Sequence, residues 1–164
     1  MRYKLTLYLC AIFALLISNT TQAQNNASED VSSELEIFRV DKTDDEETLI
    51  AVDEINAGDT VEYQLTYVNN MGEAITNLKP ELPIPQGMTL VPNTAAPEIS
   101  GASLQAQGVI QSLPIRTEFE LPNGETVVKS ATPEQYKRIQ WLVSQLNEGD
   151  SVLVSVRMAV NNPN

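Results

Sequence analysis

The chain contains no histidine, and its single cysteine, Cys10, lies near the amino terminus. Without histidine it can form neither a Ser-His-Asp triad nor a histidine-ligated zinc site. Cys10 falls inside a segment that we expect to be removed, which leaves no thiol nucleophile, iron–sulfur cluster or zinc knuckle. A domain without disulfides must be stabilised by its core alone, and the 141 residues after Ala23 are enough for this.

Long hydrophobic runs are also missing. The apolar run from Leu5 to Ile17 has 13 residues, whereas a helix that crosses a bilayer needs about 20. Arg2 and Lys4 precede this run, and a small-x-small pattern ending at Ala23 follows it. This three-part layout is typical of a cleaved secretory signal peptide, and an uncleaved anchor is the alternative.

The same layout predicts how the chain is divided. We expect a signal peptide over residues 1–23, a flexible polar leader over 24–33 and one folded domain over 34–164. The product would be exported, either periplasmic or secreted, with no integral membrane span after signal cleavage.

Positive charge is scarce. The chain has 10 basic and 22 acidic residues, and because Arg2 and Lys4 precede Ala23, the remainder carries 8 − 22 = −14. A field of that sign repels nucleic acid phosphates and anionic lipids, so we expect no nucleic acid partner. It favours cationic partners or divalent cations, and it also suits plain solvation of an exported domain.

Alternating patterns dominate what is present. After the turn Asn56-Ala57-Gly58-Asp59, apolar residues recur at every second position, and the pattern repeats after Asn147-Glu148-Gly149-Asp150. Period two with β-branched and aromatic residues predicts two half-buried strands. The residues expected on their buried faces are Val61, Tyr63, Leu65, Tyr67, Val152, Val154, Val156, Met158 and Val160.

Other signals mark shorter strands and turns. The Pro80 and Pro83 positions predict an edge strand or a broken one between Ile75 and Ile84, because proline donates no ladder hydrogen bond. The Asn123-Gly124 pair predicts a hairpin between strands that begin at Arg116 and Thr126. Further predictions are a capped helical turn at Thr132-Pro133-Glu134-Gln135, a Trp141 core anchor within a strand from Ile139 to Val143, and glycine turns at Gly58, Gly124 and Gly149.

The first strand is expected from Glu34 to Val40. Leu35 and Ile37 share one face, but Phe38 and Val40 share the other, which predicts a bulge or an edge strand that switches sheets. Altogether seven to nine short strands with no long helix favour an all-β fold, an immunoglobulin-like antiparallel β-sandwich.

Two groups of motifs share their order with a known family. The first runs from Asn56 to Asn70 and continues through Ala74-Ile75-Thr76-Asn77-Leu78 to Leu82-Pro83-Ile84-Pro85-Gln86-Gly87-Met88-Thr89-Leu90; the second joins Ala131 to Tyr136, Ile139-Gln140-Trp141 and Leu146 to Val152. From Ile55 to Val160 the chain resembles the bacterial conserved-repeat surface domain of unknown function, although Pro80-Glu81-Leu82-Pro83 departs from its commoner Asp-containing form. The resemblance implies an immunoglobulin-like fold outside the cytoplasm, and it implies no reaction, no cofactor and no catalytic residues.

Two acidic groups are candidate sites. Carboxylates at Asp41, Asp44, Asp45, Glu46 and Glu47 could hold Ca²⁺, but the glycine of the specific loop signature is absent, and a solvated loop is the simpler interpretation. Glu118 and Glu120 share a strand face about 7 Å apart, which suits a carboxylate-based glycoside hydrolase or a solvent-facing pair.

Three functions follow as expectations, and an exported chaperone or assembly factor that lends or receives a strand is a variant of the first. The first is a non-catalytic exported module, structural or binding, whose partner is an envelope protein or a surface polymer, with strand addition to a sheet edge as one mode. The second is a Ca²⁺-assisted adhesion domain built on the acidic loop. The third is the carboxylate-based glycoside hydrolase.

Overall fold

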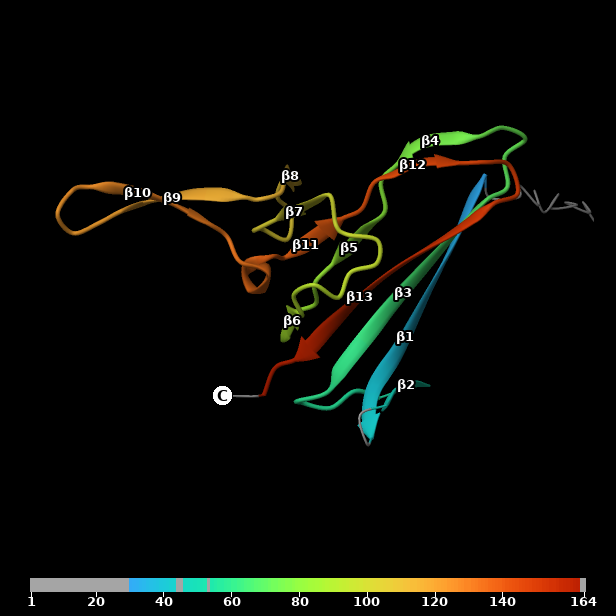
Figure 1. Ribbon diagram of the computed structural model, residues 1–164, viewed down its shortest axis with the longest axis horizontal. Helices are drawn as coiled ribbons and strands as arrows, with labels where there is room; N and C mark the ends of the chain where they lie inside the picture. The colour runs from blue at the N-terminus through green and yellow to red at the C-terminus, as the bar shows by residue number, and fades with distance from the viewer. Residues whose placement is uncertain (1–29, 44–45, 53, 163–164) are drawn as a thin grey trace, which may run out of the picture.

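A computed structural model describes residues 30–43, 46–52 and 54–162. Within these ranges the chain is all-β: it forms antiparallel strands and one 3₁₀ turn, and it has no α-helix (Figure 1). This confirms the predicted all-β class and antiparallel pairing. No helix among the described residues has the length and hydrophobicity to cross a bilayer. The predicted signal peptide and residues 24–29 of the predicted leader lie outside the described ranges.

A five-stranded sheet forms one side of the molecule, in the order β2-β1-β3-β13-β6. Its strands are β1 (Val31–Thr43), β2 (Glu46–Ala51), β3 (Thr60–Asn69), β6 (Met88–Leu90) and β13 (Ser151–Val160). The two strands predicted from strict alternation, β3 and β13, lie side by side at its centre. Their alternation is confirmed at the strand centres, where Val61, Tyr63 and Leu65 of β3 and Val154, Val156 and Met158 of β13 are buried. Nearer the strand ends, the other residues predicted on these faces, Tyr67, Val152 and Val160, are only partly buried.

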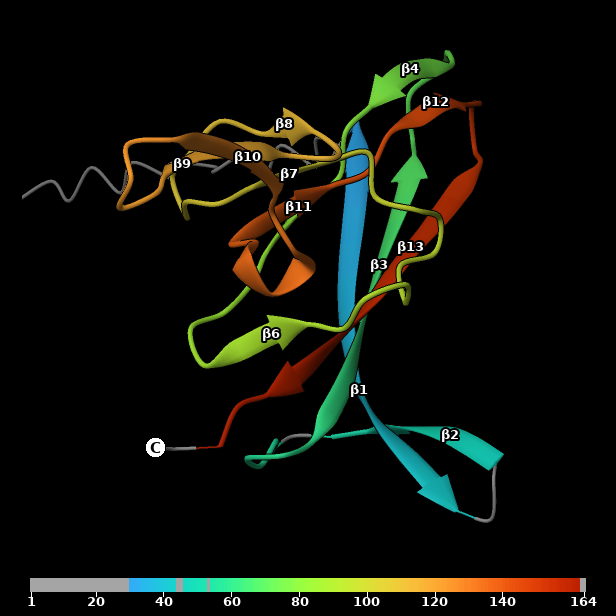
Figure 2. The same cartoon turned by 60° about the vertical axis from the view of Figure 1, so that its left-hand side comes forward.

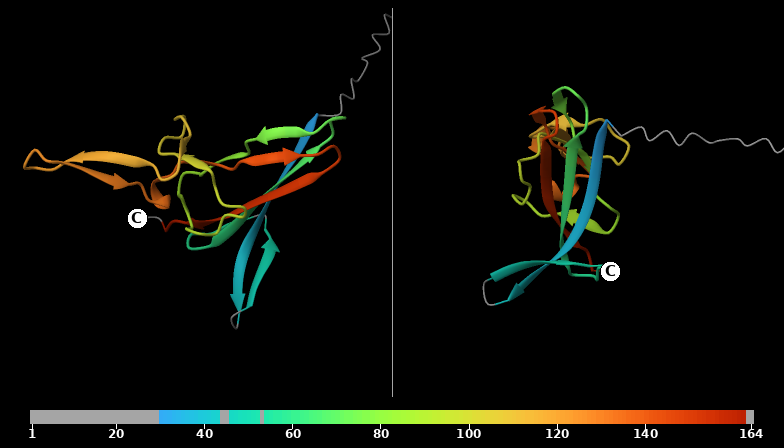
Figure 3. Two further views of the ribbon diagram at one scale, coloured as in Figure 1. Left: turned by 45° about the horizontal axis from the view of Figure 1, so that its top comes forward. Right: turned by 90° about the vertical axis from the view of Figure 1, so that its right-hand side faces the viewer.

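Strand β1 differs from its prediction in two ways. It begins at Val31, so three residues assigned to the leader belong to the strand. The predicted bulge or sheet switch is wrong, because the pairing of β1 with β3 runs without interruption from Val31 to Arg39. At Phe38 the strand instead gains a second neighbour, β2, and so continues into a hairpin that projects from the sheet (Figure 3). The apolar residues on the second face lie where this hairpin begins.

The second sheet has the order β5-β11-β7-β8, with β5 (Glu81–Pro83), β11 (Arg138–Gln140), β7 (Gly101–Ser103) and β8 (Gln111–Ser112). A two-stranded pair, β4 (Ile75–Leu78) with β12 (Val143–Leu146), extends the β5–β11 ladder in the same register. Both ladder strands are interrupted at the same level, by Pro80 and by Trp141, whose backbone N–H donates to the Pro80 carbonyl over 2.9 Å. The proline prediction is confirmed, since β5 lies at an edge and the strand is broken.

A second hairpin joins β9 (Arg116–Glu120) to β10 (Thr126–Ser130) and projects away from both sheets (Figure 1). Its turn contains Asn123-Gly124, as predicted. The 3₁₀ turn η1 (Pro133–Gln135) follows, and the Gln135 side chain accepts the Thr132 N–H over 2.9 Å, which confirms the predicted capped turn. Thirteen strands fall within the described residues, more than the seven to nine predicted, because ladder interruptions and very short strands leave little periodic signal.

Both sheets contribute to one hydrophobic core. Figure 2 shows β7, β8 and β11 on one side of the β1, β3 and β13 strands. The predicted core anchor Trp141 is buried there together with Tyr63, Leu65, Val154, Val156 and Met158 from the predicted buried faces, and Ile115 and Ile139 join them. Trp141 is fully buried, and its indole N–H donates to the Pro97 carbonyl over 2.9 Å.

Glycine turns lead into both central strands. Gly58 before β3 has φ +90°, and Gly149 before β13 has φ +73°, in the left-handed region where glycine avoids the steric cost that a Cβ would add. The Gly58 N–H donates to the Val160 carbonyl and the Gly149 N–H to the Asn69 carbonyl, both over 2.9 Å. Together with Gly124, at φ +82°, this confirms the three predicted glycine turns.

Candidate functional site

Three of the five acidic residues predicted as calcium ligands lie in the strands of the β1–β2 hairpin. Asp41 belongs to β1, Glu46 and Glu47 belong to β2, and Asp44 and Asp45 lie outside the described residues. Asp41 pairs across the ladder with Thr48, whereas Glu47 pairs with Lys42. Because successive residues of a strand point to opposite faces, Asp41 and Glu47 lie on different faces of the hairpin. In the described part of the chain, no group of three acidic residues is placed to hold a metal ion.

Two of these carboxylates already have arginine partners. Arg39 Nε donates to Asp41 Oδ1 over 2.7 Å, and this hydrogen bond lowers the pKa of Asp41. Arg157 on β13 donates to Glu47 Oε2 over 2.8 Å and to Glu62 Oε2 over 2.9 Å. Arg157 therefore joins the projecting hairpin to the centre of the sheet through β3.

The Arg157 hydrogen bond and its positive charge lower the pKa of the Glu47 carboxyl. We expect Arg157→Gln to raise that pKa toward the usual value of a glutamate, measured by carboxyl-detected NMR titration. Lys42→Gln is the matched control, because Lys42 exerts only a weaker electrostatic effect on Glu47. The ion pair stabilises the fold fully above the unfolded-state pKa, and this stabilisation is lost as the pH falls through the lower folded-state pKa. An equal rise in both variants would contradict the pairing.

Glu118 and Glu120, the candidate carboxylate pair, lie on β9 in the second projecting hairpin. Both are exposed, opposite Val128 and Thr126 of β10. Neither lines the two described pockets. The structure thus keeps the two carboxylates on one exposed strand, outside both of these pockets.

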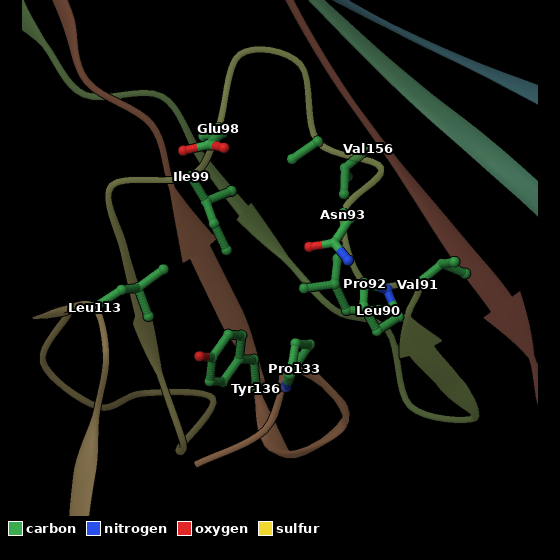
Figure 4. A pocket seen from close by; sticks show the side chains of 11 residues that line it. Leu90, Val91, Pro92, Asn93, Glu98, Ile99, Leu113, Pro133, Tyr136 and Val156 are labelled. Carbon is green, nitrogen blue, oxygen red and sulfur yellow. The ribbon is translucent and has the colours of Figure 1, made fainter. Parts of the chain in front are cut away.

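A pocket of about 340 Å³ lies between the loop from Val91 to Ile99 and turn η1 (Figure 4). Its lining comes from β6 and β13 of the first sheet, from η1 and from connecting segments, and it includes the apolar residues Leu90, Ile99, Leu113, Pro133, Tyr136 and Val156. Asn93 and Glu98 add polar side chains. This volume is at the small end of the range for ligand pockets, about 300–1,000 Å³.

The loop that forms one wall of this pocket is held firmly. Ala96 and Ser155 of β13 exchange two backbone hydrogen bonds, over 2.9 and 2.7 Å, and the Trp141 indole holds Pro97. These hydrogen bonds fix the loop to β13 and to the core. Because Glu98 is the only acidic residue of the lining, the pocket offers no carboxylate pair for acid–base hydrolysis. A second, more polar pocket of about 320 Å³ lies beside Lys79, Ser112 and Gln140 and contains no acidic residue.

A free strand edge is the third feature. Strand β1 pairs with β3 from Val31 to Arg39, but β2 covers its other side only from Phe38 onward. Over residues 31–37 no described strand occupies that side. Half of the backbone N–H and C=O groups of such an edge point outward, without a partner in the sheet. This stretch contains no proline and no lysine, two residues that commonly protect edges.

The β1 edge lies over the core, unlike the edge of β2. All six residues of β2 are exposed, so a strand added there would bury little. Next to β1, in contrast, are Tyr63 and Leu65 of β3, which belong to the core. Leu35, opposite Leu65, is 51% exposed and lies on the same face as that core. An added strand would therefore extend the five-stranded sheet and cover an apolar side chain.

Comparison with known proteins adds no neighbour: no family model matches the chain, and neither does any curated protein or solved structure. Each candidate site is therefore supported by its own geometry and by no related protein. Sequence patterns had pointed to the two acidic groups, and to an edge strand as one interpretation of residues 34–40, but not to the pocket. An alternating segment without proline or lysine was the available signal for the edge, and its missing neighbour became visible only in the sheet.

Proposed function

We propose that this protein is an exported, non-catalytic module of the cell envelope that binds a protein partner by strand addition. The export part rests on the pattern of residues 1–23, whose basic start, 13-residue apolar run and small-x-small end are those of a secretory signal. It would work in the periplasm or after secretion. A surface polymer is the alternative partner.

The β1 edge is the observation that carries this function. A polypeptide strand is the ligand that supplies N–H and C=O groups at the spacing of a ladder, which makes a protein a better fit than a polymer without backbone amides. The edge is backed by a core-forming sheet, and the residue that it exposes, Leu35, is apolar.

The fold assignment that accompanies this function is an immunoglobulin-like β-sandwich. Its support is the hydrophobic core that the two antiparallel sheets share. Trp141 belongs to this core together with residues of β11 in the second sheet and of β3 and β13 in the first. We propose membership of the conserved-repeat surface family on the motifs from Ile55 to Val160. The resemblance to this family implies no catalytic residues, which agrees with the proposed binding role.

Site-specific photocrosslinking tests the function. A benzoyl-phenylalanine at Leu35, in the protein expressed from its full sequence in its native host, is expected to give one discrete crosslinked protein. The same group at Leu142, a leucine of similar exposure (49%) in the link between β11 and β12, is the control and is expected to give none. Mass spectrometry of the purified protein should show cleavage after Ala23.

The same crosslinking experiment is repeated with Ca²⁺ and with a chelator. If adhesion depended on the acidic hairpin, the Leu35 adduct would require Ca²⁺ and would vanish with a chelator; we expect it in both conditions. The absence of an adduct, or equal adducts from Leu35 and Leu142, would overturn binding at the β1 edge. A chain that retains residues 1–23 would overturn the proposed processing.

A further inference from the structure

The outer face of the β1 edge carries uncompensated negative charge. Glu34 and Glu36 are both exposed, and they alternate with Leu35 on the opposite face. The pairing register gives their neighbours across the sheet: Glu34 lies beside Thr66 and then Leu153, and Glu36 beside Gln64 and then Ser155. No basic residue occurs in either row, and no ion pair of Glu34 or Glu36 is found among the described residues.

The nearest basic residue along β13 is already engaged. Arg157 lies one row further, opposite Glu62, and it is shared between Glu62 and Glu47. The two edge carboxylates are therefore left to interact with whatever strand lies next to β1. Opposite charges directly across a strand pair stabilise the pairing, and like charges destabilise it. These carboxylates therefore favour an incoming strand with basic residues opposite them and disfavour one with acidic residues there.

A second copy of this chain fits the edge poorly. Antiparallel pairing of two β1 edges centred on Leu35 would place Glu34 of each copy opposite Glu36 of the other. Two like-charge contacts would then lie directly across the new ladder, at the exposed outer face. The charge pattern thus disfavours self-association while leaving the backbone edge open.

The opposite face of β1 favours an incoming strand with apolar side chains. Ser33, Leu35 and Ile37 point to the face shared with the core, where Leu35 is half exposed and Ile37 is packed against the core. Tyr67 of β3, opposite Ser33, is also only partly covered. Aliphatic side chains on an added strand would cover this surface and remove apolar area from water.

We propose that the β1 edge accepts a basic, alternating strand from a partner protein: lysine or arginine toward Glu34 and Glu36, and aliphatic residues toward Leu35. This inference rests on the proposed function and adds the chemistry of the partner. The strand has at most about seven residues in register, because β2 occupies the same side of β1 from Phe38 onward. Seven residues span about 23 Å of strand.

Peptide binding followed by NMR tests the inference on the protein expressed from its full sequence. The probes are Val-Lys-Val-Lys-Val-Lys-Val, which in full register places lysines opposite Glu34 and Glu36, a version with glutamine at every lysine position, and a version of the lysine peptide with proline as its third residue. The lysine peptide is expected to shift the backbone amides of residues 31–37. The proline peptide, which lacks one N–H and fits a ladder badly, should bind at least about fivefold more weakly.

Two double variants separate local from diffuse electrostatics. Glu34→Gln with Glu36→Gln removes two charges at the edge, and Glu118→Gln with Glu120→Gln removes two equally spaced, exposed charges from the β9 strand. The edge variant should weaken lysine-peptide binding about fivefold, consistent with two cross-strand pairs, and the β9 variant less than twofold. Neither variant should alter binding of the glutamine peptide.

The outcomes distinguish this inference from the proposed function. Equal binding of the lysine and glutamine peptides at residues 31–37 would overturn the basic partner and leave strand addition standing. Equal loss in both double variants would show attraction by net charge only, and would also overturn it. If no peptide shifts the β1 amides and the Leu35 photocrosslink also fails, then the inference and the proposed function fall together.

Discussion

Replacing Trp141 with alanine is expected to lower the free energy of unfolding by about 3–5 kcal/mol, the range for large aromatic-to-alanine changes in cores. The side chain is fully buried, and its removal would leave a cavity between the two sheets. It would also leave the Pro97 carbonyl without its indole donor. Urea unfolding measured by far-ultraviolet circular dichroism is the suitable assay, because the variant has lost the only tryptophan of the chain.

Two variants make this result interpretable. Trp141→Phe keeps much of the apolar volume but removes the N–H, so we expect an intermediate loss of about 1–3 kcal/mol. Leu142→Ala changes the neighbouring residue, whose side chain is 49% exposed, and should cost less than about 1 kcal/mol. If Trp141→Ala cost no more than Leu142→Ala, the assignment of Trp141 as the anchor of the shared core would be wrong.

Local periodicity explains why the core was predictable. Alternation in β3 and β13 depends only on the residues of each strand, so Tyr63, Leu65, Val154 and Val156 could be assigned to a buried face. Backbone constraints are equally local: Pro80 cannot donate to a ladder, and Gly149 occupies a left-handed conformation. Each of these predictions is confirmed because its physical cause lies within a few residues.

Neighbour relations explain what could not be predicted. At Phe38 the apolar residues of β1 change from one face of the strand to the other. A bulge and a second neighbouring strand predict the same change, and the neighbour, β2, belongs to a separate segment of the chain. The acidic segment showed its carboxylates but not Arg157, which lies 110 positions from Glu47 and binds it. The free β1 edge is likewise a property of the whole sheet order.

Asn69 is a further residue whose importance comes from distant partners. It is polar yet fully buried at the end of β3. Its side-chain amide donates to the Glu73 carbonyl over 2.8 Å and to the Leu146 carbonyl over 3.0 Å, and its Oδ1 accepts the Met71 N–H over 2.9 Å. The Leu146 bond joins β3 of the first sheet to β12, which extends the second.

Replacing Asn69 with alanine is therefore expected to lower the free energy of unfolding by about 2–4 kcal/mol, because buried backbone groups would lose their partners. Asn123→Ala is the matched control: Asn123 Oδ1 also accepts an N–H two residues ahead, at Glu125, but in an exposed turn. That variant should cost less than about 1 kcal/mol. Equal losses in urea unfolding would contradict the role of burial.

Hydrogen exchange locates the effect. If the Asn69 amide holds the end of β3 against β12, the amides of the β3–β4 turn and of β12 should exchange faster in Asn69→Ala, relative to the unchanged protein, than those of the β1–β3 ladder. The reason is that the ladder keeps its own backbone bonds, whereas the Leu146 carbonyl and the Met71 N–H lose the side chain that pairs with them. Uniform acceleration over all strands would instead indicate a global loss of stability with no local role in joining the sheets.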